Sequence, residues 1–266
     1  MRGKPTGLVL LNTMSFIAVL IINYATATPT LNGITVADIS HKYDTLFAPA
    51  DYAFIIWSVI YLLCAGFVIY QWVLLKDDPK KYIQRTGVWF TAGNIANGLW
   101  CYCWVHAWLG WCVLLVIIQL ITLIILTVKL RLELDDEPVR TIFFVWWPIS
   151  FYIGWLIVAT VACVASWLVF LAWTGGGISP DAWAVIMIIV AFVVYLFLNQ
   201  TRNLRETALI GIWAFIAIAV RQWDVHKDIS ITAVIAIIIL SVLIGIHASK
   251  NKKTTPFAKI ARGEWK

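Results

Sequence analysis

The stretch from Pro49 to Trp72, PADYAFIIWSVIYLLCAGFVIYQW, limits more than any other what this chain can fold into. It is apolar over about the 20 residues that a helix needs to cross a bilayer. Aromatic residues recur along it, and two of them, Trp57 and Tyr61, are four positions apart. On a helix this spacing places the two rings above one another on one face. We therefore expect a transmembrane helix that forms one wall of an aromatic site within a helical bundle.

Composition extends this expectation to the whole chain. Hydrophobic residues make up 62% of its 266 residues and charged residues 13%, whereas soluble domains carry about 25% charged residues. Several apolar runs separated by short charged loops are typical of an all-α, polytopic membrane protein. The net charge of +6 is concentrated in the loops, so it does not indicate a nucleic-acid partner. The expected surroundings are the lipid bilayer.

The apolar runs predict a bundle of about eight transmembrane spans. They lie at residues 7–28, 52–75, 86–105, 107–128, within 141–173, and at 181–199, 206–222 and 229–248. The fifth run is longer than a bilayer requires, and a tilt or a kink at Pro148 would absorb the excess. Residues 29–50 are too polar to span and form the first loop.

The distribution of basic residues predicts the orientation of these spans. If the N-terminus is cytoplasmic, all but three of the 20 lysines and arginines fall on the cytoplasmic side, the exceptions being Lys42, Arg221 and Lys227. This bias follows the positive-inside rule and predicts that both termini are cytoplasmic. The tail at 250–266 is basic, and we expect it to lie at the cytoplasmic surface.

The predicted spans are nearly free of ionisable residues, which argues against ion pumps, proton relays and voltage sensors. No serine–histidine–aspartate or cysteine–histidine set is recognisable, so no catalytic residue is predicted. The five cysteines lie inside or beside apolar runs, where cysteine behaves as a small hydrophobe. Their spacing does not match a metal site, and no metal is expected.

The third span carries amide and indole side chains on one face: Asn94, Asn97, Trp100 and Trp104 recur at intervals of three, three and four. Asparagine is costly in lipid unless it has a partner, so this face should point into the bundle. Two interpretations remain open. The side chains hold helices together and belt the membrane interface, or they line a site for a planar, mostly apolar ligand.

The order and spacing of several motifs resemble the TspO/MBR family, also called translocator protein or tryptophan-rich sensory protein. The second span matches the family pattern P-x7-W-x3-Y, and later spans match its N-x2-W, its (M/L)-G-W and its proline–tryptophan–alanine pattern. The residues concerned are Pro49, Trp57, Tyr61, Asn97, Trp100, Leu109, Gly110, Trp111, Pro148, Trp155 and Ala159. The resemblance covers roughly residues 7–173.

Two features depart from the family pattern. The family usually has an asparagine eight residues after its fifth-helix tryptophan, where this chain has Cys163. Short family members also end after five spans, whereas this chain adds three at residues 174–249, followed by the tail at 250–266. In length and loop pattern the chain is similar to the long bacterial tryptophan-rich sensory proteins, which implies a bacterial cytoplasmic membrane.

The resemblance implies a five-helix domain at 1–173 with a pocket beneath the first loop, which would act as a lid. Family members bind porphyrins and related planar ligands, so the implied ligand is a tetrapyrrole such as protoporphyrin IX or haem, with no cofactor required. By motif match the pocket would be lined by Trp57, Tyr61, Asn97, Trp100, Trp111 and Trp155. A homodimer is a further expectation from the family.

We therefore predict a sensor or carrier of a planar hydrophobic ligand. One alternative is a membrane enzyme, either a lipid hydrolase or a porphyrin-degrading activity that uses the same tryptophans. Another is a small-metabolite transporter, which should show an internal repeat or broken helices in matching halves. A scaffold with a filled interior is the third.

Overall fold

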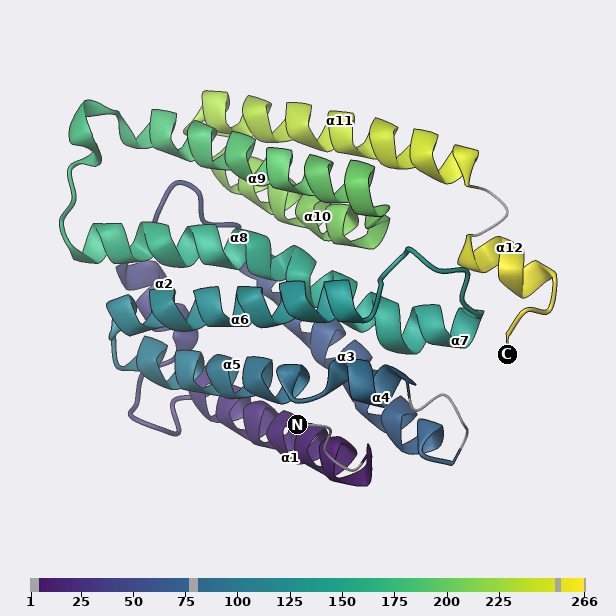
Figure 1. Cartoon of the computed structure of the whole chain (residues 1–266). Coiled ribbons are helices and arrows are strands. Elements are labelled where there is room, and N and C mark those ends of the chain that lie inside the picture. The colour runs from purple at the N-terminus through teal and green to yellow at the C-terminus, as the bar shows by residue number, and fades with distance from the viewer. Residues whose placement is uncertain (1–4, 77–80, 252–254, 266) are drawn as a thin grey trace. The chain divides into compact units, whose positions relative to one another are not determined.

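The computed structural model describes residues 5–76, 81–251 and 255–265, and every regular element among them is a helix (Figure 1). The fold is therefore all-α, as the apolar runs predict. Six of the basic residues behind the predicted orientation, Arg2, Lys4, Lys80, Lys252, Lys253 and Lys266, lie outside the described residues.

Six helical segments are long and apolar enough to cross a membrane. They are α1 (Pro5–Ala27), η1 with α3 (Asp51–Leu74), α6 (Leu109–Lys129), α7 to α8 (Val139–Phe170), α9 (Pro180–Arg202) and α11 (Lys227–Lys250). The other two predicted spans are also helices: α5 (Trp89–Val105) has 17 residues, and α10 (Arg205–Gln222) has 18 and carries three charged ones. The count of eight spans stays a prediction.

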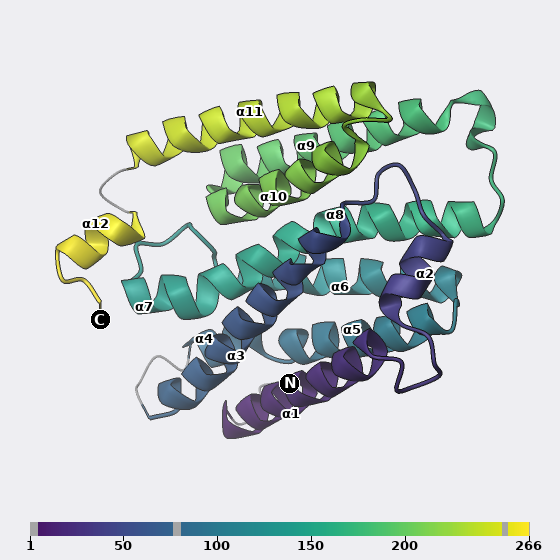
Figure 2. The same cartoon turned by 180° about the vertical axis from the view of Figure 1, so that it is seen from behind.

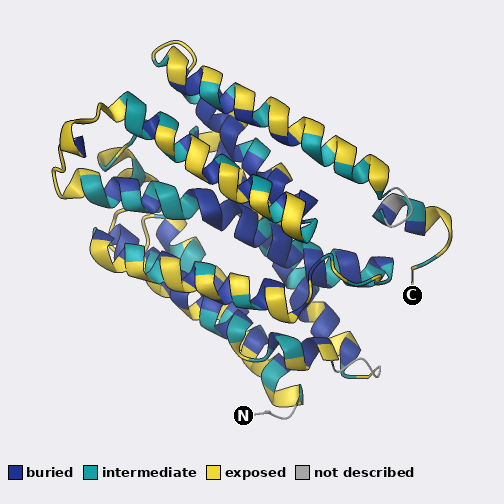
Figure 3. Cartoon of the chain, turned by 45° about the horizontal axis from the view of Figure 1, so that its top comes forward, coloured by how far each residue is buried: buried dark blue, intermediate teal, exposed yellow. Residues whose placement is uncertain are grey.

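Large apolar side chains remain exposed along the outer faces of these helices (Figure 3). Met14 and Ile21 of α1 are 67% and 63% exposed, and Ile238 of α11 is 56% exposed. Soluble monomers rarely expose apolar surface on this scale, whereas a bilayer covers it with acyl chains. The exposed faces and the long apolar helices together identify an integral membrane protein.

The structure divides into two compact units, which are described separately. Unit 1 comprises the described residues of Met1–Thr45, Cys64–Leu130 and Ala159–Thr174, and unit 2 those of Leu46–Leu63, Arg131–Val158 and Gly175–Lys266. The units do not follow the division predicted at residue 173. That division rests on likeness to shorter proteins, whereas the units rest on packing, and it stays a prediction.

In unit 1, α1 lies beside α5, and α5 beside α6 (Figures 1 and 2). The unit also holds α2 (Val36–Lys42) in the first loop and α4 (Lys81–Thr86). Thr35 starts α2 with a capping box, because its hydroxyl accepts from the backbone N–H of Asp38 and the Asp38 carboxylate accepts from the backbone N–H of Thr35.

In unit 2, α9, α10 and α11 lie side by side (Figure 1). Ser179 caps α9 and Pro180 follows as its first residue, which is where proline is favoured. Asn203 ends α9 in the left-handed conformation, at φ 57°. The unit also contains the short helices η3 (Gly175–Gly177) and α12 (Pro256–Ala261).

The long fifth run, for which we expected a tilt or a kink at Pro148, is irregular near its start. The α-helical turn α7 (Val139–Thr141) leads into the π-helix η2 (Ile142–Trp146), and α8 (Trp147–Phe170) follows. Proline has no backbone N–H, and its ring crowds the carbonyl four residues earlier. The wider π-turn immediately before Pro148 accommodates that disruption within a continuous helix.

A glycine lets α8 approach α10 closely within unit 2. A methyl group on Gly154 would come within 2.9 Å of both Cβ of Ile210 and the carbonyl oxygen of Thr207. The same region is tied by hydrogen bonds from Tyr195 Oη to the Gly154 carbonyl (2.6 Å) and from Thr207 Oγ1 to the Ser150 carbonyl (3.0 Å). Small residues allow such approach between membrane helices.

We predict that Gly154→Ala destabilises the protein by about 1–3 kcal/mol, because the added methyl overlaps backbone and Cβ atoms that cannot rotate away. The measurement is the thermal unfolding midpoint of detergent-purified protein. Gly245→Ala on α11 is the matched control, since no atom lies within 4 Å of its added methyl. A midpoint for Gly154→Ala equal to that of Gly245→Ala would contradict the proposed close approach.

Candidate functional site

Residues of α3 and α8 that belong to unit 2 form an aromatic cluster. Trp57 and Tyr61 stack with centroids 5.4 Å apart and planes 24° from parallel, as their spacing predicts. Tyr152 of α8 meets Trp57 edge-to-face at 5.7 Å. Trp57 and Tyr61 are both half-buried. The cluster therefore presents flat ring faces that are neither fully covered nor fully exposed.

Trp155 forms a neighbouring ring pair with Phe54 of η1 (Asp51–Ile55), which it meets edge-to-face at 5.7 Å. Phe54 lies three residues before Trp57 in the chain, and Trp155 lies three residues after Tyr152. The Trp155 side chain is 1% exposed, and its indole N–H is buried without a hydrogen-bond partner among the described residues. A buried indole N–H usually has a partner. Trp155 is thus a hydrogen-bond donor that a bound acceptor could satisfy.

Asn97 lies in unit 1, in a row of amide contacts between α1 and α5. Asn23 Nδ2 donates to Asn97 Oδ1 at 3.1 Å, and Asn94 Nδ2 donates to Ser15 Oγ at 3.1 Å. Asn12 extends the row by donating to Gln71 Oε1 at 2.9 Å. These contacts fit the first interpretation of the polar face, in which its amides hold helices together.

Trp100 also lies in unit 1, stacked on Trp104 with ring centroids 4.8 Å apart. Trp104 Nε1 donates to the backbone carbonyl of Val36 in α2 at 3.1 Å, and Asn32 Nδ2 donates to that of Val105 at 3.0 Å. The first part of the loop is thereby tied to the end of α5. Cys163, the residue that departs from the family pattern, lies beside Trp100.

Trp111 is 62% exposed at the start of α6. It lines an open groove of about 700 Å³ in unit 1, together with Trp108, Trp167 and Phe170. The groove differs in its environment from the ring cluster of unit 2, because Trp108 and Trp111 are exposed and Trp167 is half-buried. Trp111 is therefore a candidate for interfacial anchoring as well as for ligand binding.

The six predicted residues thus fall into two sets. Trp57 and Tyr61 stack in unit 2, where Trp155 also lies, whereas Asn97, Trp100 and Trp111 lie in unit 1. Sequence reasoning did not select Phe54 and Tyr152 for the site. The signal for Tyr152 was its position three residues before Trp155, which places both on one side of α8.

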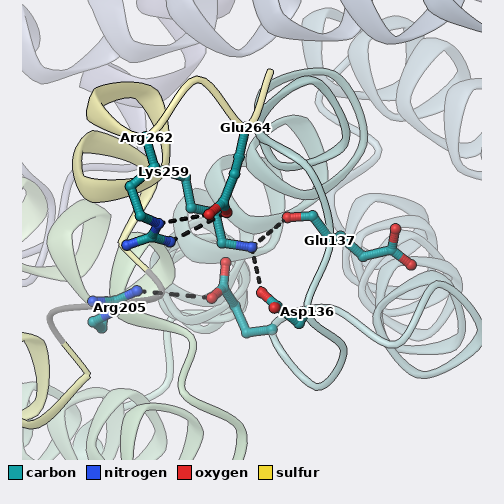
Figure 4. A network of polar contacts seen from close by, with 7 residues as sticks. Asp136, Glu137, Arg205, Lys259, Arg262 and Glu264 are labelled. Carbon is teal, nitrogen blue, oxygen red and sulfur yellow. Dashed lines mark hydrogen bonds and ion pairs between the residues drawn. The ribbon is translucent and has the colours of Figure 1, made fainter. Parts of the chain in front are cut away.

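Among the described residues, no group of three or more histidine, cysteine, aspartate or glutamate side chains could hold a metal ion. The same residues contain a charged cluster, which lies in unit 2 (Figure 4). Arg205 Nη2 lies 3.8 Å from Glu133 Oε2, and each side chain is 8% exposed. Lys259 donates to Asp136 and to the backbone carbonyl of Glu137 (2.6 Å).

The charged cluster attaches the C-terminal tail to residues 136–139. Lys259 of α12 is 3% exposed, and the backbone N–H of Val139 donates to the Glu264 carbonyl at 3.2 Å. Tail residues 260–263 and 265 are exposed, whereas Lys259 packs against the loop at 131–138. Burying a lysine charge costs free energy, which its bonds to Asp136 and to the Glu137 carbonyl offset.

Burial raises the pKa of the Glu133 carboxyl to about 8, and the neighbouring Glu206 carboxylate adds to the rise. Arg205 and Lys259 oppose it without cancelling it. Glu133 therefore takes up its proton far more readily in the folded protein than in water.

A sequence model of the family described as TSPO-like protein matches residues 9–246. The match includes α9, α10 and most of α11 as well as the earlier helices. No curated protein and no solved structure was found to match the chain.

We predict that Asn23 and Asn97 are energetically coupled. In a double-mutant cycle of Asn23→Ala and Asn97→Ala, unfolding free energies should deviate from additivity by about 0.5–1.5 kcal/mol, the range found for hydrogen bonds between membrane helices. Asn23→Ala with Asn94→Ala is the control pair, because Asn94 bonds to Ser15 instead. Equal coupling in both pairs would be evidence against the specific Asn23–Asn97 contact.

We also predict that stability falls as the pH rises. The unfolded chain loses the Glu133 proton near pH 4.5 and the folded protein near pH 8. Between these values the unfolded state binds fewer protons, so the unfolding free energy declines with rising pH and levels off above about pH 8. Glu133→Gln should flatten this profile.

The measurement is the thermal midpoint of wild type and variant from pH 5 to pH 9. Asp135→Asn serves as the matched control, since Asp135 lies in the same loop and pairs with the exposed Arg131 at 2.8 Å. Its profile should keep the wild-type slope. An unchanged slope in Glu133→Gln would show that another group governs the pH dependence.

Proposed function

Since the chain belongs to the TSPO-like family, we propose that its aromatic cluster binds a planar, hydrophobic ligand of the porphyrin type. In this proposal the protein is a membrane sensor or carrier of that ligand. Asn97, Trp100 and Trp111, which the family resemblance also implies as ligand contacts, belong to unit 1 and stay predictions from the sequence.

The observation that carries the proposal is the arrangement around Trp57. Its ring is stacked on Tyr61 and approached edge-on by Tyr152, and both stacked rings are half-buried. Flat aromatic faces that remain accessible favour offset stacking with another planar π-system. The ligand gains apolar burial from the rings and orientation from a small number of polar groups.

In unit 2, Trp155 is a candidate for such a polar group. Its buried indole N–H lacks a partner among the described residues, and a ligand carboxylate or carbonyl oxygen would accept from it. A hydrogen bond to a charged acceptor contributes about 1.5–3 kcal/mol. Protoporphyrin IX and haem both pair a flat apolar ring with carboxylates, so they fit this combination.

The membrane and the orientation of the chain in it are part of the same proposal. We place the protein in a bacterial cytoplasmic membrane with both termini cytoplasmic, because of the bias of its basic residues. A homodimer would agree with the family expectation.

The test is a titration of detergent-purified protein with protoporphyrin IX, followed by tryptophan-fluorescence quenching. Wild type should show saturable quenching. Trp57→Phe should weaken binding several-fold, corresponding to about 1 kcal/mol of lost stacking. Trp155→Phe should weaken it similarly, because phenylalanine cannot donate a hydrogen bond.

Trp265→Phe is the matched control, since Trp265 is 49% exposed in the C-terminal tail. Its affinity should equal that of wild type. If Trp57→Phe and Trp155→Phe also bind as wild type does, the cluster is a packing element and the proposed function is wrong.

A further inference from the structure

The second part of the first loop, residues 46–53, is held by the side chains and backbone of α10. Gln222 Nε2 donates to the Leu46 carbonyl at 2.9 Å, and Arg221 Nη1 donates to the Ala48 carbonyl at 3.1 Å. The backbone N–H of Ala50 donates to the Ala217 carbonyl at 3.2 Å. All these residues belong to unit 2.

Every second residue from Leu46 to Ala50 bonds to α10. Its backbone polar groups at residues 46, 48 and 50 bond to α10, while Phe47 and Pro49 between them are buried. This alternation is what an extended chain produces, since successive residues face opposite sides. The segment therefore uses one side for packing and the other for attachment to α10.

The α10 groups that meet the loop lie along one face of the helix. Trp213, Ala217 and Arg221 are spaced four residues apart, which puts them in one row. Trp213 Nε1 donates to the Ala53 carbonyl at 3.1 Å, and its ring meets Tyr52 edge-to-face at 5.6 Å. Gln222, next to Arg221, is 5% exposed. The row extends the attachment from residue 46 to residue 53.

The attached segment runs directly into the aromatic cluster. Ala53, the last residue bonded to α10, is followed by Phe54, whose ring meets Trp155. One helical turn later comes Trp57, which stacks on Tyr61. Any displacement of residues 46–53 must therefore be transmitted to the start of this cluster.

We propose that α10 is a clamp on residues 46–53, and that Trp213, Arg221 and Gln222 are positioning residues that set the rate at which a planar ligand enters and leaves the aromatic cluster. The inference rests on the proposed function. It assigns a role to the helices that follow residue 174, because the clamp needs α10 and α10 packs against both α9 and α11.

The first arm of the test needs no ligand. Hydrogen exchange of backbone amides in residues 46–56 is compared by mass spectrometry between full-length wild type and two variants, Trp213→Phe and Arg221→Met/Gln222→Leu. Each lost hydrogen bond should speed local exchange by about fivefold. Trp223→Phe, at the exposed end of the same helix, is the matched control and should exchange as wild type does.

The second arm measures kinetics by stopped-flow mixing with protoporphyrin IX. Both clamp variants should show association and dissociation rates raised together by about fivefold, with a smaller change in Kd, because the clamp slows passage more than it alters the bound state. Arg221→Lys keeps a donor at this position and should restore rates close to those of wild type.

The outcomes separate the two proposals. Unchanged exchange in residues 46–56 overturns the clamp, whatever the ligand does. Faster exchange with unchanged porphyrin rates overturns the control of ligand passage. If wild type shows no saturable porphyrin binding, the proposed function fails, and the exchange arm still decides whether α10 holds the loop.

Discussion

Buried polar groups need hydrogen-bond partners within the protein, because each one left unsatisfied costs about 1–3 kcal/mol. Most of the described architecture follows from this constraint. Asn97 of α5 pairs with Asn23 of α1, and the carbonyls of Leu46 and Ala48 receive donors from α10. The carbonyls of residues 36 and 105 receive donors from Trp104 and Asn32. These bonds decide which apolar helix faces meet.

The same constraint distinguishes the two kinds of tryptophan in the chain. The indole N–H groups of Trp104 and Trp213 donate to the backbone carbonyls of Val36 and Ala53, so these two tryptophans hold the first loop in place. Trp155 is as well buried but has no such partner among the described residues. In the proposed function, this indole N–H would donate to a ligand oxygen, and the accessible faces of Trp57 and Tyr61 would stack on the ligand ring.

The sequence predicted the all-α membrane fold well, because apolar runs near the length of a bilayer leave few other solutions. It also predicted the Trp57–Tyr61 stack, since this follows from local geometry. The π-helix before Pro148 was not predicted, although a tilt or a kink was expected at that proline. It did not predict that Asn97 bonds to Asn23 or that Lys259 is buried. These contacts join residues distant in the chain, and a single sequence carries no signal for such pairings.

Hydrogen exchange with and without protoporphyrin IX tests the central claim most directly. We predict protection of residues 52–61 and 150–157, which contain the ring cluster of unit 2. Protection confined to residues 107–114 and 167–170 would place the ligand in the groove lined by Trp111 and Trp167 and would contradict the account. The absence of any protection at saturating porphyrin would contradict it as well.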